Sequence, residues 1–516
     1  MNLHASQAEI DALEDVLRHA GPGSGLVAAK VALAWHLRQR DSGRSLRLVQ
    51  DVMPVVRSPA QGDAVASCRA RAALAAAEAS ALFGETAEAE RSLADARGNL
   101  SPAWDPQAEG DAWLVEAVVA RTRGQSDRLL AALRMAGRCF ERIADRPRLE
   151  IARAWVEFER LVAHPESGLT LEARSATTEP DMARDAICAA ARAFALSCRN
   201  PAAATRAFAH AGELARSRGL VMLQVTCQLE TGALIHELGD YDRAARCFDA
   251  AAMLARATGW PLLVTACDTH LGALLCDLGA FEESQRTLEK TIEALSVRQR
   301  GPLLARAHAA LARTLLAGRR TGEAVAHMDA AMGVLRTAGS PRELAAGLIL
   351  QARVLAASLQ PRRAAEVLSE AQALVESCGF ESMRVALCQA QADVHHRFRL
   401  PRPPDMTLPS AALHFAEEAL ARGSRLTGWS ARAALLDFLA ERWAEAGDHE
   451  RAYVHARSAL TAKDRETAQK MSYPLALLRV RRHAEVRAGP DPDSPVNDPA
   501  ANPGPSEPSG RDARPH

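Results

Sequence analysis

The sequence predicts an all-α solenoid, a right-handed superhelix of stacked antiparallel helix pairs. Three observations support this fold class. Apolar residues make up 48% of the 516 residues but aromatic residues only 4%, and this Ala-, Leu- and Val-rich composition suits close helix packing better than β-sheets. A pattern of small and large apolar residues returns every 40 residues in the middle of the chain. A turn, with glycine in the clearest copies, precedes that pattern.

The repeat unit is clearest around "LGDYDRAARCFDAAAMLARATGW", residues 238–260. From the turn at Gly239, steps of 40 residues reach Gly279, Arg319 and Leu359, and one step back reaches Arg199. The helix after each turn carries a small residue, a large apolar residue four positions later and a small residue three positions further on. In chain order these triplets are Ala204, Phe208 and Ala211; Ala244, Phe248 and Ala251; Ser284, Leu288 and Thr291; Ala324, Met328 and Ala331; Ala364, Leu368 and Ala371.

Close packing explains this spacing. Small residues allow two helices to approach each other, and a large residue one helical turn later fills the space beside them. The helix before each turn carries a matching pair, Thr231-Gly232, Leu271-Gly272 or Leu311-Ala312. Because one helix pair cannot bury its apolar faces alone, the units must stack.

Weaker copies extend the array, which we expect to run over residues 1–461 as about ten to eleven helix pairs. They begin near Ser45, Ala89, Leu129 and Ala452, and Leu129 departs from the small-residue rule. We expect irregular structure at 163–181, either a surface loop or a hinge, and at the proline-rich 399–409. Residues 462–488 read as an exit helix, and the Pro-, Ser-, Gly- and Asp-rich residues 489–516 predict a disordered tail.

Charge and cysteine content exclude several classes of protein. The chain has 63 basic and 63 acidic residues, which gives no electrostatic footprint for nucleic acid or a membrane surface. No apolar run is long enough to span a membrane. The ten cysteines are scattered without a C-x-x-C pair, which indicates small buried residues in a reducing cytoplasm.

Catalytic and cofactor motifs are missing from the sequence. There is no phosphate-binding G-x-x-x-x-G-K-[ST] loop, no H-E-x-x-H metal motif, no G-x-S-x-G elbow and no Gly-Gly pair. His395 and His396 are adjacent on a predicted helix and face different directions, which makes them a poor metal pair. The sequence therefore predicts a protein that is not an enzyme and takes no cofactor or metal.

The unit resembles the tetratricopeptide repeat, and "GDYDRA" at 239–244 and "GDHERA" at 447–452 carry the resemblance best. Units of 40 residues, longer than the usual 34, resemble those of MalT-like bacterial regulators. In such solenoids the first helix of each pair lines a concave groove. The register implies that this groove includes Thr226, Leu229, His236, Glu237, Thr269, Asp277, Arg306, Arg313, Arg353, Asp437 and Glu441.

Two interpretations of these groove residues stay open. A stripe formed by Arg306, Arg313 and Arg353 could grip an acidic peptide or a carboxylate terminus. Alternatively, the charges form a solvated helix face in which each pairs with a neighbour. The lysine and asparagine set of the carboxylate clamp found in chaperone-binding tetratricopeptide proteins is not present.

The borders of the array, residues 33–52 and 452–488, resemble the tetratricopeptide sensory region that precedes the diguanylate cyclase domain of proteobacterial signalling proteins. Pro474 interrupts the exit helix, and no cyclase motif follows. The resemblance implies a protein- or peptide-binding scaffold or sensory module in bacterial signalling. The alternatives are a regulatory subunit of a separately encoded cyclase or transcription factor, or an enzyme with an unrecognised site.

Overall fold

The computed structural model describes residues 2–19, 23–56, 63–101, 103, 105–165, 167, 182–197, 200–296, 301–379, 381–400 and 406–471. Within these ranges the chain forms 22 α-helices. Their bounds are α1 Gln7–His19, α2 Ser24–Leu37, α3 Ser42–Val56, α4 Asp63–Phe83, α5 Thr86–Gly98, α6 Ala108–Thr122, α7 Ser126–Arg142, α8 Arg146–Ala163, α9 Met182–Ser197, α10 Pro201–Arg218, α11 Val221–Glu237, α12 Tyr241–Thr258, α13 Pro261–Asp277, α14 Phe281–Ser296, α15 Gly301–Ala317, α16 Thr321–Ala338, α17 Pro341–Ala357, α18 Pro361–Cys378, α19 Glu381–Phe398, α20 Ala411–Gly423, α21 Ala433–Glu445 and α22 His449–Met471.

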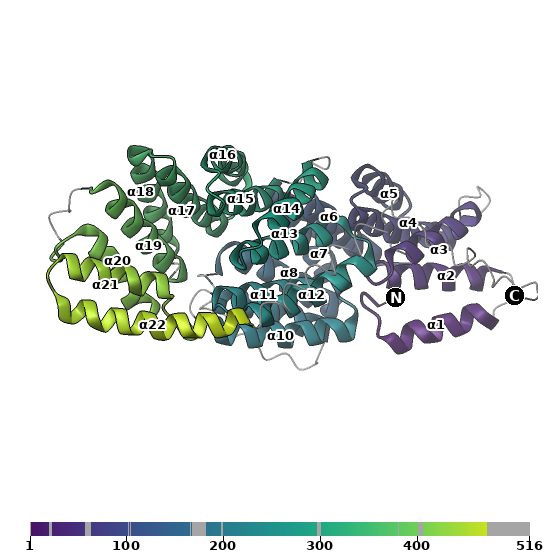
Figure 1. The fold of residues 1–516 in the computed structure, drawn as a ribbon. Coiled ribbons are helices and arrows are strands. Elements are labelled where there is room, and N and C mark those ends of the chain that lie inside the picture. Colours follow the sequence, from purple (N-terminus) through teal and green to yellow (C-terminus); the bar gives the residue numbers. More distant parts are fainter. Residues whose placement is uncertain are drawn as a thin grey trace, which may run out of the picture.

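Consecutive helices pack as pairs, and the pairs stack into an elongated solenoid (Figure 1). The first helices of successive pairs also contact one another: α11 touches α13, α13 touches α15, α15 touches α17 and α17 touches α19. We call these the inner helices, and their shared surface the inner face. In the N-terminal half α2, α4 and α6 occupy the same place, because α2 contacts α4 and α4 contacts α6. The predicted all-α fold class is confirmed.

The predicted repeat positions form the contacts between helices. All fifteen residues of the five triplets are at most 4% exposed. A Cβ added to Gly232 would lie 2.5 Å from Cε1 of Phe248, and one added to Gly272 would lie 2.6 Å from Cγ of Leu288. Where the small residue is serine, its hydroxyl donates to the facing helix, as Ser284 Oγ does to Gly272 O at 2.7 Å. Small residues therefore hold the two helices of a pair in direct contact.

The turns keep one backbone conformation even where glycine is lost. Gly239 and Gly279 have φ values of 86° and 82°, and Arg319 and Leu359 adopt φ values of 61° and 58° at the equivalent positions. For residues with a Cβ this left-handed conformation costs energy, roughly 1 to 2 kcal/mol. The tertiary packing of the pair therefore imposes the turn on side chains that disfavour it.

Leu359→Gly should stabilise the protein. Leu359 is 70% exposed at a φ of 58°, so glycine would relieve backbone strain without removing a buried side chain. We expect a gain of about 1 kcal/mol in the free energy of unfolding, measured by urea denaturation. Leu359→Ala keeps the strain and is the control; an equal gain in both variants would contradict the explanation.

The predicted irregular segments lie largely outside the described residues. Residues 168–181 and 401–405 are not described, and neither is the predicted tail at 489–516. On either side of the first gap the core continues: Phe158 of α8 packs edge to face on Phe194 of α9, which packs on Phe208 of α10. At the C-terminal end α22 continues without a break from the last repeat to Met471, past residue 462.

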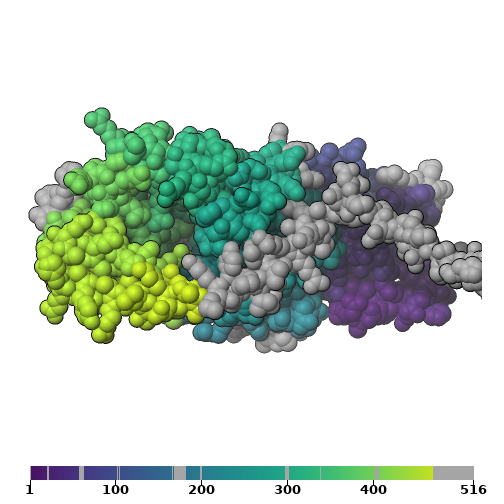
Figure 2. Space-filling view, viewed as in Figure 1, coloured from purple at the N-terminus to yellow at the C-terminus, as the bar shows by residue number. Residues whose placement is uncertain are grey.

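The solenoid turns back on itself, so that helices far apart in sequence touch. Trp260, at the start of α13, donates from Nε1 to Ser42 Oγ of α3 at 3.0 Å, and α13 contacts α4. Leu82 of α4 belongs to the hydrophobic cluster of α11–α13. Figure 2 shows the resulting elongated particle, with the N-terminal helices at one end and α20–α22 at the other.

Acid should destabilise the fold through histidines that the core holds neutral. His270 stacks on the ring of Phe248 with centroids 5.2 Å apart, and burial lowers its pKa to about 3. The unfolded chain therefore takes up a proton below pH 6.5 that the folded chain refuses, so stability falls as the pH drops from 6.5 toward 3. Urea denaturation at pH 7 and pH 5 should show this loss, and His270→Phe should show a smaller one. An unchanged pH dependence in the variant would contradict the assignment.

Candidate functional site

The predicted groove residues of α11, α13 and α15 meet in one cluster on the inner face. His236 Nε2 lies 2.7 Å from Asp277 Oδ2, and Arg313 Nη1 lies 3.4 Å from the same oxygen. Arg313 also donates to Ala273 O of α13 at 2.9 Å. Burial alone would raise the pKa of Asp277, but the hydrogen bond from His236 and the charge of Arg313 lower it. Asp277 is thus an anion that joins three neighbouring inner helices.

The other two predicted arginines also face acids of the adjacent inner helix. Arg306 Nε lies 3.5 Å from Glu343 Oε1, and Arg353 Nε lies 3.9 Å from Asp393 Oδ2. Both separations exceed the roughly 2.7–2.9 Å of a charge-assisted hydrogen bond. Charges that pair with neighbours are therefore present, as one of the two interpretations expected, but the pairing leaves guanidinium N–H groups available.

Arg353 is the least satisfied of these arginines. Its Nε is buried and has no hydrogen-bond partner among the described residues. Burial lowers the pKa of Arg353, as do the nearby charges of Arg432 and Arg313, while Asp393 acts in the opposite direction. Three guanidinium groups from α15, α17 and the start of α21 therefore influence one region of the inner face.

The remaining predicted groove residues are not part of this cluster. Leu229 is 6% exposed in the core of α11–α13. Thr269 is 7% exposed, and its hydroxyl donates to Thr265 O of its own helix at 2.8 Å. Neither side chain is therefore presented to a ligand. Thr226 bonds Met222 O at 2.9 Å, Glu237 is exposed, Asp437 pairs with Lys463 at 2.8 Å, and Glu441 pairs with Arg442 at 3.2 Å.

The C-terminal helix supplies residues that the sequence did not point to. Its end returns toward α12, which it contacts (Figure 1). Glu466 of α22 accepts from Ala433 N at 2.8 Å, and its charge reaches Tyr241, whose pKa is raised by burial first. Arg432 acts on Tyr241, Asp277 and Arg353 together. The last helix pair therefore returns to the inner face near α12 and α13.

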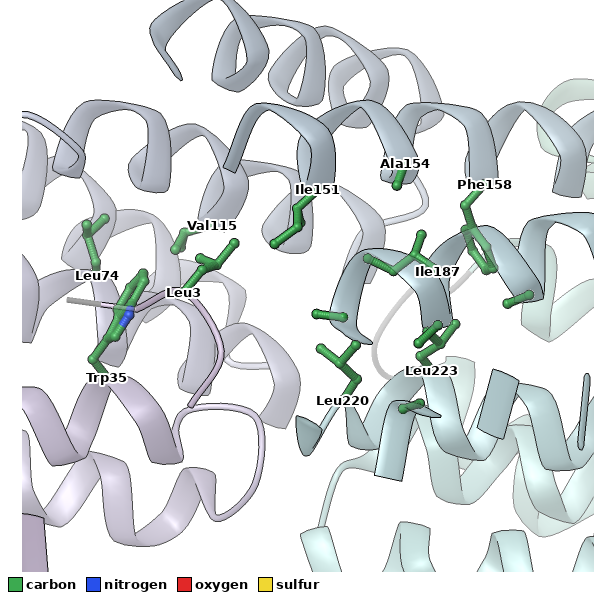
Figure 3. Packing of buried hydrophobic residues seen from close by; sticks show 14 of the residues in the cluster. Leu3, Trp35, Leu74, Val115, Ile151, Ala154, Phe158, Ile187, Leu220 and Leu223 are labelled. Atoms are coloured by element: carbon green, nitrogen blue, oxygen red, sulfur yellow. The ribbon is translucent and has the colours of Figure 1, made fainter. Parts of the chain in front are cut away.

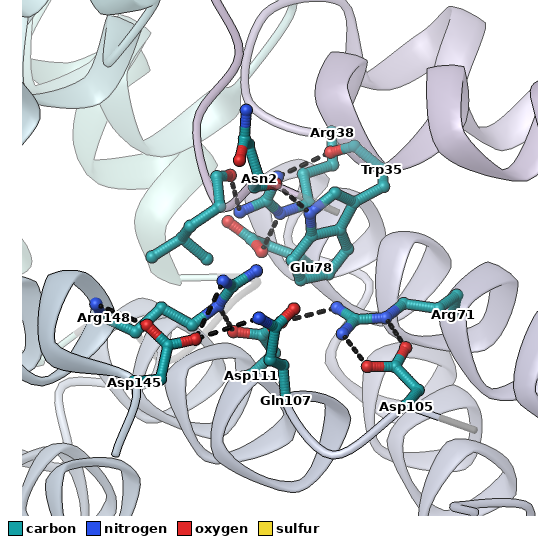
Figure 4. Close-up of polar contacts among 11 residues, drawn as sticks. Asn2, Trp35, Arg38, Arg71, Glu78, Asp105, Gln107, Asp111, Asp145 and Arg148 are labelled. Atoms are coloured by element: carbon teal, nitrogen blue, oxygen red, sulfur yellow. Dashed lines mark hydrogen bonds and ion pairs between the residues drawn. The ribbon is translucent and has the colours of Figure 1, made fainter. Parts of the chain in front are cut away.

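A second polar cluster, also missed, lies on the inner face of the N-terminal half (Figure 4). Asp111 of α6 is fully buried and bonds Arg71 Nη1 of α4 at 2.5 Å and Arg148 Nε of α8 at 3.0 Å. Nearby, Arg38 of α2 donates from Nε to Glu78 Oε2 of α4 at 2.7 Å. Arg38 and Arg71 also stack on the ring of Trp35, with Cζ 3.7 Å and 4.9 Å from its centroid. These ion pairs tie neighbouring inner helices together.

The two adjacent histidines face different neighbours. His395 lies against the ring of Phe415 with centroids 5.2 Å apart, whereas His396 Nδ1 lies 2.8 Å from Arg442 Nη1. Within the described ranges, no group of three or more His, Cys, Asp or Glu side chains is placed to hold a metal ion. Over the same residues, no helix has the length and apolar character needed to cross a membrane.

Neither a family model nor a curated protein matches this sequence. Among solved structures, a Rap protein complexed with competence and sporulation factor is similar over 70% of this chain and 99% of its own, with a TM-score of 0.53 and 11% identity. The Rap conjugation gene regulator of plasmid pLS20, in complex with the Phr* peptide, covers 71% and 96%, with a TM-score of 0.45 and 12% identity. The human IFIT1 dimer with m7Gppp-AAAA covers 87% and 98%, with a TM-score of 0.39 and 12% identity.

Only the first of these likenesses is close enough to bear on the fold, and at 11% identity it bears on the fold alone. It agrees with the helix pairs, the buried repeat positions and the inner helices described above. The chain is an all-α solenoid of tetratricopeptide-like helix pairs.

Proposed function

We propose that this protein binds a partner protein or peptide without catalysing a reaction, and that it holds an acidic segment or a free carboxylate against the inner face of α13–α19. The observation that carries this proposal is Arg353, a buried guanidinium whose Nε has no hydrogen-bond partner among the described residues. A buried charge that is incompletely paired costs free energy, and a bidentate carboxylate would recover it.

The surroundings of Arg353 suit an anionic ligand. Arg313 and Arg432 add positive charge, and the nearest acid, Asp393, stays 3.9 Å from Arg353 Nε. An incoming carboxylate could approach the guanidinium more closely than Asp393 does and displace little.

The similar Rap structure was solved as a complex with competence and sporulation factor, so a solenoid of this kind can hold a second molecule. Together with the resemblance to bacterial sensory regions, this supports a role for the present chain as a binding module in a regulatory or signalling pathway. A scaffold and a regulatory subunit both fit that role.

Fluorescence anisotropy with two labelled peptides tests the proposal. One peptide carries two glutamates and a free C-terminal carboxylate; its counterpart carries glutamines and a C-terminal amide. We expect the acidic peptide to bind, and Arg353→Met to weaken its binding at least tenfold, which corresponds to about 1.4 kcal/mol.

Arg363→Met is the matched control, because Arg363 is an exposed arginine of the outer helix α18 that bonds Gln360. It should bind the acidic peptide as the unmodified chain does. Equal binding of the two peptides, or equal losses in the two variants, would refute the proposed groove.

A further inference from the structure

The segment Asn2–Ala5 lies against the N-terminal inner face as a peptide ligand would. Its backbone carbonyl groups accept hydrogen bonds from side chains of the receptor surface. Trp35 Nε1 donates to Asn2 O at 3.0 Å, and Arg38 Nη2 donates to Leu3 O at 3.1 Å. Arg40 Nη2 donates to Ala5 O. Recognition of backbone carbonyl groups by side chains does not require one particular peptide sequence.

Leu3 anchors this segment. Its side chain is 6% exposed and belongs to the hydrophobic cluster that contains Trp35, Leu74 and Val115 (Figure 3). Those three residues come from α2, α4 and α6, so one leucine contacts the common inner face of three helix pairs. A buried apolar anchor within a frame of polar contacts is the usual energetic centre of a peptide interface.

The surface that receives the segment is held in place by contacts of its own. Arg38 donates to Glu78 Oε2 at 2.7 Å and to Trp35 O at 2.5 Å, in addition to its bond to Leu3. Its guanidinium stacks on Trp35. Donors fixed in this way remain aimed at the site when the segment leaves, which lowers the entropic cost of binding another peptide.

A cavity continues the site beyond His4. It contains about 440 Å³ of empty space, open solvent included, and Leu3 and His4 form one of its walls. The other walls are mostly apolar and come from α6, α7, α8 and α11: Leu114, Ala117, Val118, Leu133, Trp155 and Met222. A ligand longer or bulkier than the segment therefore has room to extend.

The charges around His4 indicate which residue would fit best there. Burial first, and then the positive charges of Arg38, Arg148 and Arg40, lower the pKa of His4 well below its usual value. A side chain that carries negative charge at this position would meet the same guanidinium groups as attraction.

We propose that the inner face of α2, α4 and α6 is a second binding site, for a short peptide that carries a leucine-like residue followed by an acidic one. Asn2–Ala5 occupies this site in the present conformation and acts as a built-in competitor. The site is separate from the Arg353 region and does not depend on it.

Peptide binding to the full chain tests this assignment. The probes are labelled peptides acetyl-Asn-Leu-Glu-Ala-Ser-amide and the same sequence with lysine in place of glutamate. In the Leu3→Gly variant the internal segment loses its anchor, so the glutamate peptide should bind at least tenfold more tightly than it does to the unmodified chain. The lysine peptide should bind at least tenfold more weakly than the glutamate peptide. Circular dichroism checks the fold, and Leu3→Ala is a milder second variant.

Two further variants locate the bound peptide. Adding Trp35→Phe to Leu3→Gly removes the indole N–H donor and should weaken binding, whereas adding Arg353→Met should leave it unchanged. The assignment is overturned if folded Leu3→Gly and Leu3→Ala show no saturable binding up to about 1 mM, the effective concentration of a tethered segment. It is equally overturned if the two peptides bind alike, or if Arg353→Met rather than Trp35→Phe weakens binding.

Discussion

Replacing Asp111 by alanine should destabilise the protein by about 3–5 kcal/mol, the usual cost of removing one partner from a buried ion pair. Asp111 is fully buried and receives Arg71 at 2.5 Å and Arg148 at 3.0 Å. Burial alone would lower the pKa of Arg71, but Asp111 and Asp105 raise it above its ordinary value. Without Asp111, both guanidinium groups lose a buried counter-charge. Urea denaturation followed by circular dichroism measures the loss.

Two control variants separate burial from charge. Asp51→Ala removes an aspartate that is 60% exposed and pairs with Lys30 at 3.1 Å; it should cost under about 0.5 kcal/mol. Asp111→Asn keeps an acceptor oxygen without the charge and should fall between the two alanine variants. If Asp111→Ala were as mild as Asp51→Ala, the cluster would have no structural role.

Replacing Ala244 by leucine should cost about 1–3 kcal/mol, because it overpacks the contact between α11 and α12. Ala244 is fully buried, in the same cluster as Phe248. Gly232 on the facing helix leaves no slack, since a single added Cβ would approach Phe248 Cε1 to 2.5 Å. The thermal unfolding temperature and urea denaturation both report the loss.

Ala250→Leu is the matched control, on the same helix but at an exposed position. It should change the free energy of unfolding by no more than about 0.5 kcal/mol. Equal effects at the two positions would show that the 40-residue register is misplaced.

Part of the inner face was within reach of sequence reasoning. Arg38 and Glu78, and likewise Arg71 and Asp111, pair across 40 residues, the length of one repeat unit. Opposite charges one repeat apart, on the helices that precede the turns, are therefore a readable signal of ion pairs between neighbouring inner helices. The same rule would have added Asp393 to the predicted Arg353. The register alone, however, placed Leu229 and Thr269 in the groove, where side-chain packing buries them in the core instead.

The sequence by itself determined the helix pairs, their 40-residue period and the small residues at their contacts, because these features depend on neighbours within one or two repeat units. Only the tertiary structure decided how the superhelix closes on itself. The bond from Trp260 to Ser42, 218 residues away, the return of α22 to α12 and the docking of Leu3 all depend on that closure. Each sums small rotations over many stacked units, and no local pattern of side chains encodes such a sum.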